Sequence, residues 1–253
     1  MNQEKRIWIV GGSSGIGLEL VKLCLKANYK VVVSSRTATA NEALLILQEI
    51  YKENISLIDF DVSLKDEIQT AVKKAWNSFD GMDIWFYNAG AYEVMDIDTW
   101  SSEKFEKMNE VNYLGVIRVM TTLLPYFKEK KKGHWVWNSS ISSYFGLPLG
   151  GGYSAPKAAL VNLAQSIQPE LDKFNIKLQI INHGFVKTRL TDKNEFEMPQ
   201  LMQPKYTAQK ILIGIQNPNS FEIRFPLALS LFLRVLSLLP YKISLGLTKK
   251  MLP

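Results

Sequence analysis

Short β-branched runs alternate with amphipathic helical stretches along most of the chain, and this alternation limits the folds that the chain can adopt. We expect strands at 7–10, 31–34, 55–59, 83–87, 135–139 and 177–181. Helices are expected at about 15–27, 41–53, 64–79, 103–127 and 153–174. This order predicts an α/β fold with a doubly wound parallel sheet of about seven strands and helices on both faces.

The 253 residues, of which 47% are hydrophobic, are enough to bury the core of one domain. We expect a single Rossmann-type domain over residues 1–253. The net charge of +6 is spread along the chain, so we expect no nucleic-acid partner, and the basic run 128–132 is interpreted as a solvated turn. The charged start lacks a signal-peptide pattern, which predicts a cytoplasmic location. We expect no metal site.

A glycine-rich turn follows the first expected strand and leads into a helix. Its sequence is GGSSGIG, residues 11–17. Glycines permit positive φ angles and let the backbone approach a pyrophosphate, while free N–H groups at the helix start stabilise its charge. A glycine turn without a ligand is the alternative. The candidate cofactor-binding residues of this loop are Gly11, Ser13, Ser14, Gly15, Ile16 and Gly17.

The second expected strand ends in Ser34-Ser35-Arg36 and lacks the acidic residue that would accept a hydrogen bond from a ribose hydroxyl. Arg36 instead offers a guanidinium group to a 2′-phosphate, although a plain surface cation is the alternative. This position therefore favours NADP(H) over NAD(H) as the cofactor.

Tyr153 and Lys157 lie four residues apart at the expected start of a helix, so both project from one helix face. An adjacent ammonium group favours the phenolate form, and we expect it to lower the pKa of Tyr153 enough for acid–base work. Pro156 is expected in the first helical turn, where its missing N–H costs little. A Tyr-x-x-x-Lys pair on an ordinary helix surface is the alternative.

GGSSGIG, Asn88-Ala89-Gly90, Ser139-Ser140 and YSAPK occur in an order and spacing that resemble the classical short-chain dehydrogenases/reductases over about residues 5–190. The resemblance implies a catalytic tetrad of Asn112, Ser140, Tyr153 and Lys157. In that family Ser140 would bind the substrate oxygen, and Asn112 would help to hold a water. The cofactor-binding residues that the resemblance adds are Asp61, Val62, Asn88, Ala89, Gly90, Tyr153, Lys157, Val186 and Thr188.

Three departures from the family pattern stand near this site: Val10 for a frequent threonine, Tyr87 for an asparagine, and His183 for a proline. Val10 and Tyr87 leave the hydrogen bonding between strand and loop open. His183 is interpreted as a loop residue, with substrate contact as the alternative. Asp61 and Thr188 have ordinary alternatives as caps of a helix or turn, and Asn112 as a core amide.

The resemblance implies an oxidoreductase that interconverts a carbonyl and an alcohol, with residues 189–210 as a substrate lid and a homodimer or homotetramer as the assembly. Apolar residues such as Tyr92, Phe185 and Phe196 suggest a lipophilic small-molecule substrate, although ordinary core packing explains most of them equally well. A catalytically silent NADP(H)-binding regulatory protein is the alternative from another class.

The chain ends in an apolar stretch, residues 226–253, which we expect to form a helical extension. Arg234 and Pro240 interrupt it, and the run before Pro240 is short for a bilayer crossing. The extension is expected to seal the substrate pocket or form a subunit contact. Peripheral contact with a membrane surface, as in an enzyme that acts on lipid-like substrates, is the alternative.

Overall fold

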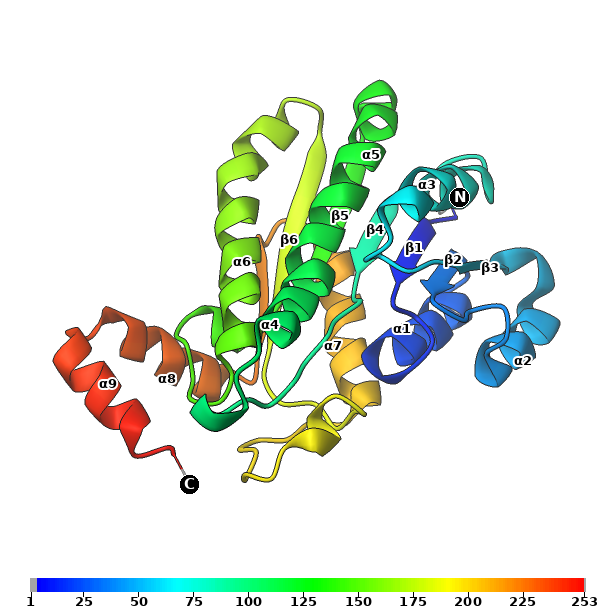
Figure 1. Ribbon diagram of the computed structural model, residues 1–253. Helices are drawn as coiled ribbons and strands as arrows, with labels where there is room; N and C mark the ends of the chain where they lie inside the picture. Colours follow the sequence, from blue (N-terminus) through cyan, green and yellow to red (C-terminus); the bar gives the residue numbers. More distant parts are fainter. Residues whose placement is uncertain (1–3, 253) are drawn as a thin grey trace.

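The computed structural model describes residues 4–252, and seven parallel strands form one sheet at its centre (Figure 1). The strands lie in the order β3-β2-β1-β4-β5-β6-β7. Their bounds are β1 Arg6–Val10, β2 Lys30–Ser35, β3 Ile55–Asp59, β4 Ile84–Tyr87, β5 Gly133–Asn138, β6 Ile176–His183 and β7 Glu222–Phe225. Six of these match expected strands within one or two residues, and β7 adds the seventh. The predicted α/β fold with a doubly wound parallel sheet is confirmed.

Helices cover both faces of the sheet (Figure 1). The helices are α1 Gly15–Lys26, α2 Glu42–Tyr51, α3 Ile68–Asn77, α4 Ser102–Asn109, α5 Gly115–Lys130, α6 Gly151–Asp172, α7 Pro204–Gln216, α8 Leu227–Leu238 and α9 Tyr241–Lys249. One buried cluster joins α3, α5 and α6 to the sheet, and a second joins α1 and α7 to the other face. The strand order reverses between β1 and β4, where open α/β sheets bind their ligands beyond the carboxyl ends of the strands.

Large aromatic side chains fill the first of these clusters. Trp85 meets Trp135 edge to face, with ring centroids 5.4 Å apart, and Trp137 stacks on Trp135. Trp8 is also fully buried, and its indole N–H donates to the Ser34 hydroxyl at 2.7 Å. Central parallel strands are buried on both faces, which is why these strands tolerate such bulky apolar residues.

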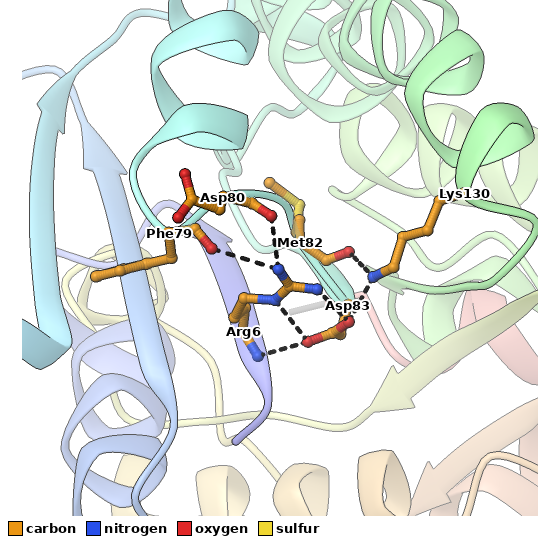
Figure 2. A network of polar contacts seen from close by, with 6 residues as sticks. All are labelled: Arg6, Phe79, Asp80, Met82, Asp83 and Lys130. Atoms are coloured by element: carbon orange, nitrogen blue, oxygen red, sulfur yellow. Dashed lines mark hydrogen bonds and ion pairs between the residues drawn. The ribbon is translucent and has the colours of Figure 1, made fainter. Parts of the chain in front are cut away.

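An ion-pair network closes the amino edge of the sheet, opposite the ligand edge (Figure 2). The Arg6 guanidinium binds the Asp83 carboxylate through two N–H donors at 3.0 Å, and the Lys130 ammonium binds the same carboxylate. These hydrogen bonds hold the pKa of Asp83 well below its ordinary value. The solvated turn expected at 128–132 starts later than predicted, because α5 continues through Lys130, whose ammonium binds Asp83. The chain turns at Lys131, and all residues of this run except Lys130 are exposed.

The prediction of one regular helix at 103–127 was wrong. This segment consists of α4 and α5 with a π-helical turn, Glu110–Leu114, between them. A π-turn inserts one residue into the helical repeat and frees a carbonyl from the regular ladder. The Tyr87 hydroxyl donates to the Val111 carbonyl of this turn at 2.7 Å. Gly115 makes room for that hydroxyl, because a Cβ at this position would lie 2.4 Å from it.

Candidate active site at the carboxyl edge of the sheet

The glycine-rich loop leaves β1 and enters α1 at the carboxyl edge. Gly11 and Gly15 have positive φ angles of 86° and 53°. A Cβ on Gly11 would lie 2.6 Å from the Ala89 nitrogen, so only glycine allows the close approach of the two loops. Ser14 is the N-cap of α1, yet its side chain accepts no hydrogen bond from the first helical turn. The helix start therefore presents backbone N–H groups without a side-chain cap, as an anion site requires.

Two asparagines brace this loop from the neighbouring strands. The Asn88 side chain donates to the Gly11 carbonyl at 2.8 Å, and the Asn138 side chain donates to Asn88 Oδ1 at 2.8 Å. The Asn88 backbone N–H donates to the Val10 carbonyl, so valine at position 10 leaves this strand-to-loop bond intact. The sequence analysis missed Asn138, whose only signal was an amide at the end of a strand that also contains Trp135, Val136 and Trp137.

Arg36 lies just beyond β2 as an exposed side chain. The N–H groups of Gly11 and Gly12 both donate to the Ser34 carbonyl, which places the end of β2 directly beside the glycine loop. Among residues 4–252, Arg36 has no carboxylate within salt-bridge distance. A free guanidinium group at this edge suits a phosphate ligand.

Asp61 and Val62 follow β3 on the same edge. The Asp61 carboxylate accepts hydrogen bonds from the Ser63 N–H at 2.9 Å and the Ser63 hydroxyl at 2.7 Å. Val62 is buried, and its Cβ faces Gly115 of α5. Asp61 thus stabilises its own turn, which corresponds to the ordinary capping interpretation, and this local role holds Val62 in place.

Tyr153 and Lys157 project from the first two turns of α6. The Lys157 ammonium lies 5.6 Å from the centre of the Tyr153 ring and donates to the Asn138 carbonyl at 2.7 Å. Burial lowers the pKa of Lys157 to about 7. Pro156 was wrongly expected in the first turn: α6 begins at Gly151, so Pro156 lies in the second turn, where its missing N–H would have bound the Gly152 carbonyl.

The expected lowering of the pKa of Tyr153 was wrong for the ligand-free protein. Burial raises this pKa to about 12, against a smaller lowering by the nearby Ser140 hydroxyl. The ammonium does not overcome burial because Lys157 binds the Asn138 carbonyl rather than the phenol. Ser140 Oγ accepts a hydrogen bond from the Ser142 N–H at 3.2 Å, which leaves its own O–H free to donate. The phenol therefore holds its proton at neutral pH.

Asn112 lies in the π-turn and is fully buried. Its side chain accepts from the Ala91 N–H at 3.0 Å and donates to the Ala91 carbonyl at 2.8 Å. This pair of bonds holds the loop after β4, including Gly90, against the helix. In the ligand-free chain the Asn112 amide thus acts as a hydrogen-bonded core amide, and its second N–H donor is not used in these two bonds.

The segment after β6 covers the site from the other side. Thr188 faces the glycine loop, because its Cγ2 lies 3.1 Å from the position of a Cβ on Gly15. Val186 is buried and pairs with Met202, which closes the segment between them into a loop. The substrate lid was expected to extend over residues 189–210. In the structure α7 begins at Pro204, so the last seven residues of that range belong to this helix.

Tyr92 connects this loop to the catalytic candidates. Its ring packs edge to face on Tyr153, with centroids 5.2 Å apart, and its hydroxyl donates to Asn194 Oδ1 at 2.7 Å. Phe185 packs edge to face on Phe196 at 5.9 Å. The Tyr153 ring thus packs against Tyr92, whose hydroxyl is bound to the loop after β6.

His183 was wrongly interpreted as a loop residue, because it is the last residue of β6. Its Nδ1 atom bonds the Gly184 carbonyl at 2.7 Å, and its ring packs over Phe225. Burial and the nearby Lys157 charge lower the pKa of His183 to about 4. The imidazole is therefore neutral at physiological pH, with the Nδ1 proton on the carbonyl side.

The C-terminal helices reach this site through Tyr144. The Tyr144 hydroxyl donates to the Glu222 carboxylate of β7, which also binds Arg234 of α8. The Arg234 guanidinium lies 4.9 Å from the centre of the Tyr144 ring. Leu233 and Leu236 of α8 pack on Ile141, which follows Ser140 directly. The first of the two C-terminal helices is therefore part of the support for the Ser140 loop.

Residues 5–198 match the sequence profile of the short chain dehydrogenase family, and the chain belongs to that family. Similar proteins include uncharacterized oxidoreductases of staphylococci. The one from Staphylococcus haemolyticus is 29% identical over 210 residues, which is 83% of this chain and 90% of that protein. The one from Staphylococcus saprophyticus is 29% identical over 238 residues, covering 88% and 96% of the two chains.

Solved structures show the same fold. A short-chain dehydrogenase from Streptomyces avermitilis superposes with a TM-score of 0.84 over 98% of both chains, at 21% identity. ElxO with NADP bound superposes with a TM-score of 0.78 at 26% identity, over 88% of this chain and 98% of ElxO. Class and fold are thereby established: the chain is an oxidoreductase of the short-chain dehydrogenase family.

Proposed function

We propose that the chain is an NADP(H)-dependent oxidoreductase that interconverts a carbonyl group and a secondary alcohol on a lipophilic small molecule. The observation that carries the proposal is the placement of Tyr153 and Lys157 on one face of α6, with the Ser140 hydroxyl beside the phenol. A protonated phenol, a free hydroxyl donor and a buried ammonium are the groups that carbonyl reduction needs around the reacting oxygen.

The residues at the carboxyl edge fit a dinucleotide phosphate. The uncapped start of α1 in the glycine loop would hold the pyrophosphate, and Arg36 would bind the 2′-phosphate. Lys157 uses one donor on the Asn138 carbonyl, which leaves two for ribose hydroxyls. Asp61 and Val62 would flank the adenine, and Asn88, Ala89 and Gly90 would pack beside the cofactor. Thr188 would approach the nicotinamide carboxamide, and Val186 is a further cofactor-binding candidate. The 26% identity to ElxO, which binds NADP, supports this choice of cofactor.

Side chains of the protein transfer the proton to the substrate oxygen. NADPH, when bound, supplies a hydride to the carbonyl carbon. Ser140 donates a hydrogen bond to the carbonyl oxygen and orients it toward Tyr153. The Tyr153 hydroxyl gives its proton to that oxygen, and the Lys157 ammonium stabilises the phenolate that remains. The same groups work in reverse for oxidation.

An apolar substrate is favoured by the side chains that surround the phenol. Tyr92 packs on Tyr153, and the segment to which its hydroxyl is bound carries the aromatic pair Phe185 and Phe196. In such a pocket each added methylene that is buried contributes about 0.8 kcal/mol, which is roughly a fourfold gain in kcat/KM.

The test is NADPH oxidation with a homologous series of methyl ketones and with aromatic aldehydes and quinones. We expect turnover that rises with chain length until the pocket is full, and a loss of about 100-fold or more in Ser140→Ala. A constant or falling kcat/KM along the series would contradict the lipophilic substrate. Tight NADPH binding without turnover of any carbonyl would instead support a silent regulatory protein.

A further inference from the structure

Two consecutive helices, α8 and α9, project from one end of the domain (Figure 1). Both carry exposed apolar side chains. On α8 they include Leu231, Phe232, Val235 and Leu238, and Leu238 is 84% exposed. On α9 Tyr241 is 77% exposed, and Ile243 and Leu245 are also exposed. A concentration of exposed apolar side chains on two consecutive helices marks a contact surface.

The inner face of α8 is already satisfied by the chain itself. Leu233 and Leu236 are buried against Ile141 and its neighbours, and Arg234 is paired with Glu222. These contacts set the rotation of α8 about its axis. Because the buried stripe is complete, the outer stripe is not spare core that a small shift of the helix would bury.

α9 has the reverse of the usual amphipathic pattern. Its buried positions are the polar Ser244 and Thr248, whose hydroxyls bond back to carbonyls of the same helix. Its exposed positions include Ile243, Leu245 and Leu247. With 3.6 residues per turn, Ile243 and Leu247 lie on one flank of the helix and Tyr241 and Leu245 on the other. Exposed leucines lose hydrophobic stabilisation in water, so both flanks suit an apolar environment supplied from outside the chain.

The charge of residues 226–253 indicates the kind of partner that α8 and α9 bind. Residues 226–253 contain Arg234, Lys242, Lys249 and Lys250 and no aspartate or glutamate. Arg234 is neutralised by Glu222, whereas the three lysines have no carboxylate within salt-bridge distance in the part of the chain that the structure describes. An apolar face edged only by cations complements anionic lipid headgroups over acyl chains. A self-contact of two such faces would bring these lysines together without an acidic partner.

We propose that α8 and α9 form a docking surface for an anionic lipid bilayer, on which both helices lie parallel to the membrane. Helix length agrees with this orientation, because no helix within residues 4–252 is long and apolar enough to cross a membrane. The docking itself is independent of the proposed function. Where that function holds, docking brings the Ser140 loop, which α8 supports, next to a reservoir of lipophilic carbonyl compounds.

The experiment is co-sedimentation of the full chain with vesicles of phosphatidylcholine alone and of phosphatidylcholine mixed with phosphatidylserine. We expect binding to the mixed vesicles that weakens as salt is raised. The variant Phe232→Ser/Leu238→Ser should bind at least about tenfold more weakly, because it removes two inserted side chains. Lys249→Glu/Lys250→Glu should lose binding chiefly at low salt.

The matched control is Leu45→Ser/Ile50→Ser, which removes two exposed apolar side chains from α2 instead. Its vesicle binding should equal that of the unaltered chain, and circular dichroism should show every variant folded. Absence of binding to mixed vesicles overturns the proposal, as does an equal loss in the control. A different result would also overturn the proposal: the unaltered chain does not bind vesicles, and Phe232→Ser/Leu238→Ser lowers the molar mass of the assembly in solution. The surface would then be a subunit interface. NADPH turnover in the absence of lipid tests the proposed function separately.

Discussion

Arg36 is an exposed cation beside the glycine loop, and the proposed preference for NADP(H) depends on this one side chain. We predict that Arg36→Leu weakens NADPH binding about 10- to 100-fold, because it removes a charge-assisted hydrogen bond to phosphate, and leaves NADH binding almost unchanged. Titration calorimetry with both nucleotides measures the two constants. Lys73→Leu, an equal change of charge on the exposed face of α3, serves as the control. Equal losses for both nucleotides would rule out 2′-phosphate recognition by Arg36.

Lys157 is a buried cation whose folded-state pKa, about 7, lies far below its ordinary value. Between about pH 7 and 10 the unfolded chain holds one more proton at this lysine than the folded chain, so the free energy of unfolding rises with pH in this range. We predict that Lys157→Met removes this rise and stabilises the ligand-free protein at pH 7 by about 1–4 kcal/mol. Urea unfolding from pH 6 to 10 provides the measurement.

The same Lys157→Met variant should lose carbonyl turnover, because neither the phenolate nor the ribose would have its cationic partner. A variant that is less stable than the unaltered chain at pH 7 would contradict the burial of an uncompensated charge. Gained stability with lost activity is the combination that a functional lysine at this position requires.

At the scale of elements, the π-turn between α4 and α5 depends on a contact between Tyr87 and Gly115. Tyr87→Phe leaves the Val111 carbonyl without its donor and should cost about 1–3 kcal/mol. Gly115→Ala should also destabilise, because its Cβ would lie 2.4 Å from the Tyr87 hydroxyl. We predict that Gly115→Ala costs clearly less in the Tyr87→Phe background, as measured by a double-mutant cycle of urea unfolding. Additive costs would show that the two sites are independent.

Local patterns predicted the strands and the glycine loop well, because both features depend on residues that are adjacent in the sequence. The π-turn was not predictable, since one extra residue in a helical repeat leaves its composition unchanged. Asn138 was missed for a different reason: its partner Asn88 lies fifty residues away in sequence, and only the pairing of β4 with β5 brings them together.

At the scale of the whole molecule, the two edges of the sheet have separate tasks. The Arg6–Asp83–Lys130 network fastens the amino edge, while the carboxyl edge keeps uncapped amides, a free guanidinium and a buried ammonium. The sequence predicted an apolar extension at 226–253, but not which residues of α8 and α9 are buried. For α8 this depends on Glu222 and Ile141, which lie outside the extension.

The pKa of Tyr153 shows the same dependence on the whole fold. The four-residue spacing to Lys157 suggested a lowered pKa, yet the ligand-free chain raises it, because burial acts on both groups and the ammonium binds the Asn138 carbonyl. Spacing placed the two side chains on one helix face correctly, whereas the balance of burial and charge required the surrounding strands and loops.

The account depends most directly on the Tyr153 hydroxyl, and the decisive measurement is NADPH oxidation by Tyr153→Phe beside a titration of NADPH binding. Tyr92→Phe is the matched control, since it removes a hydroxyl from the adjoining ring, which bonds Asn194 rather than the substrate oxygen. We predict that Tyr153→Phe retains NADPH affinity within about threefold and loses turnover by at least about 100-fold, while Tyr92→Phe stays within about tenfold of the unaltered chain. Turnover by Tyr153→Phe at the rate of the unaltered chain would contradict the central claim.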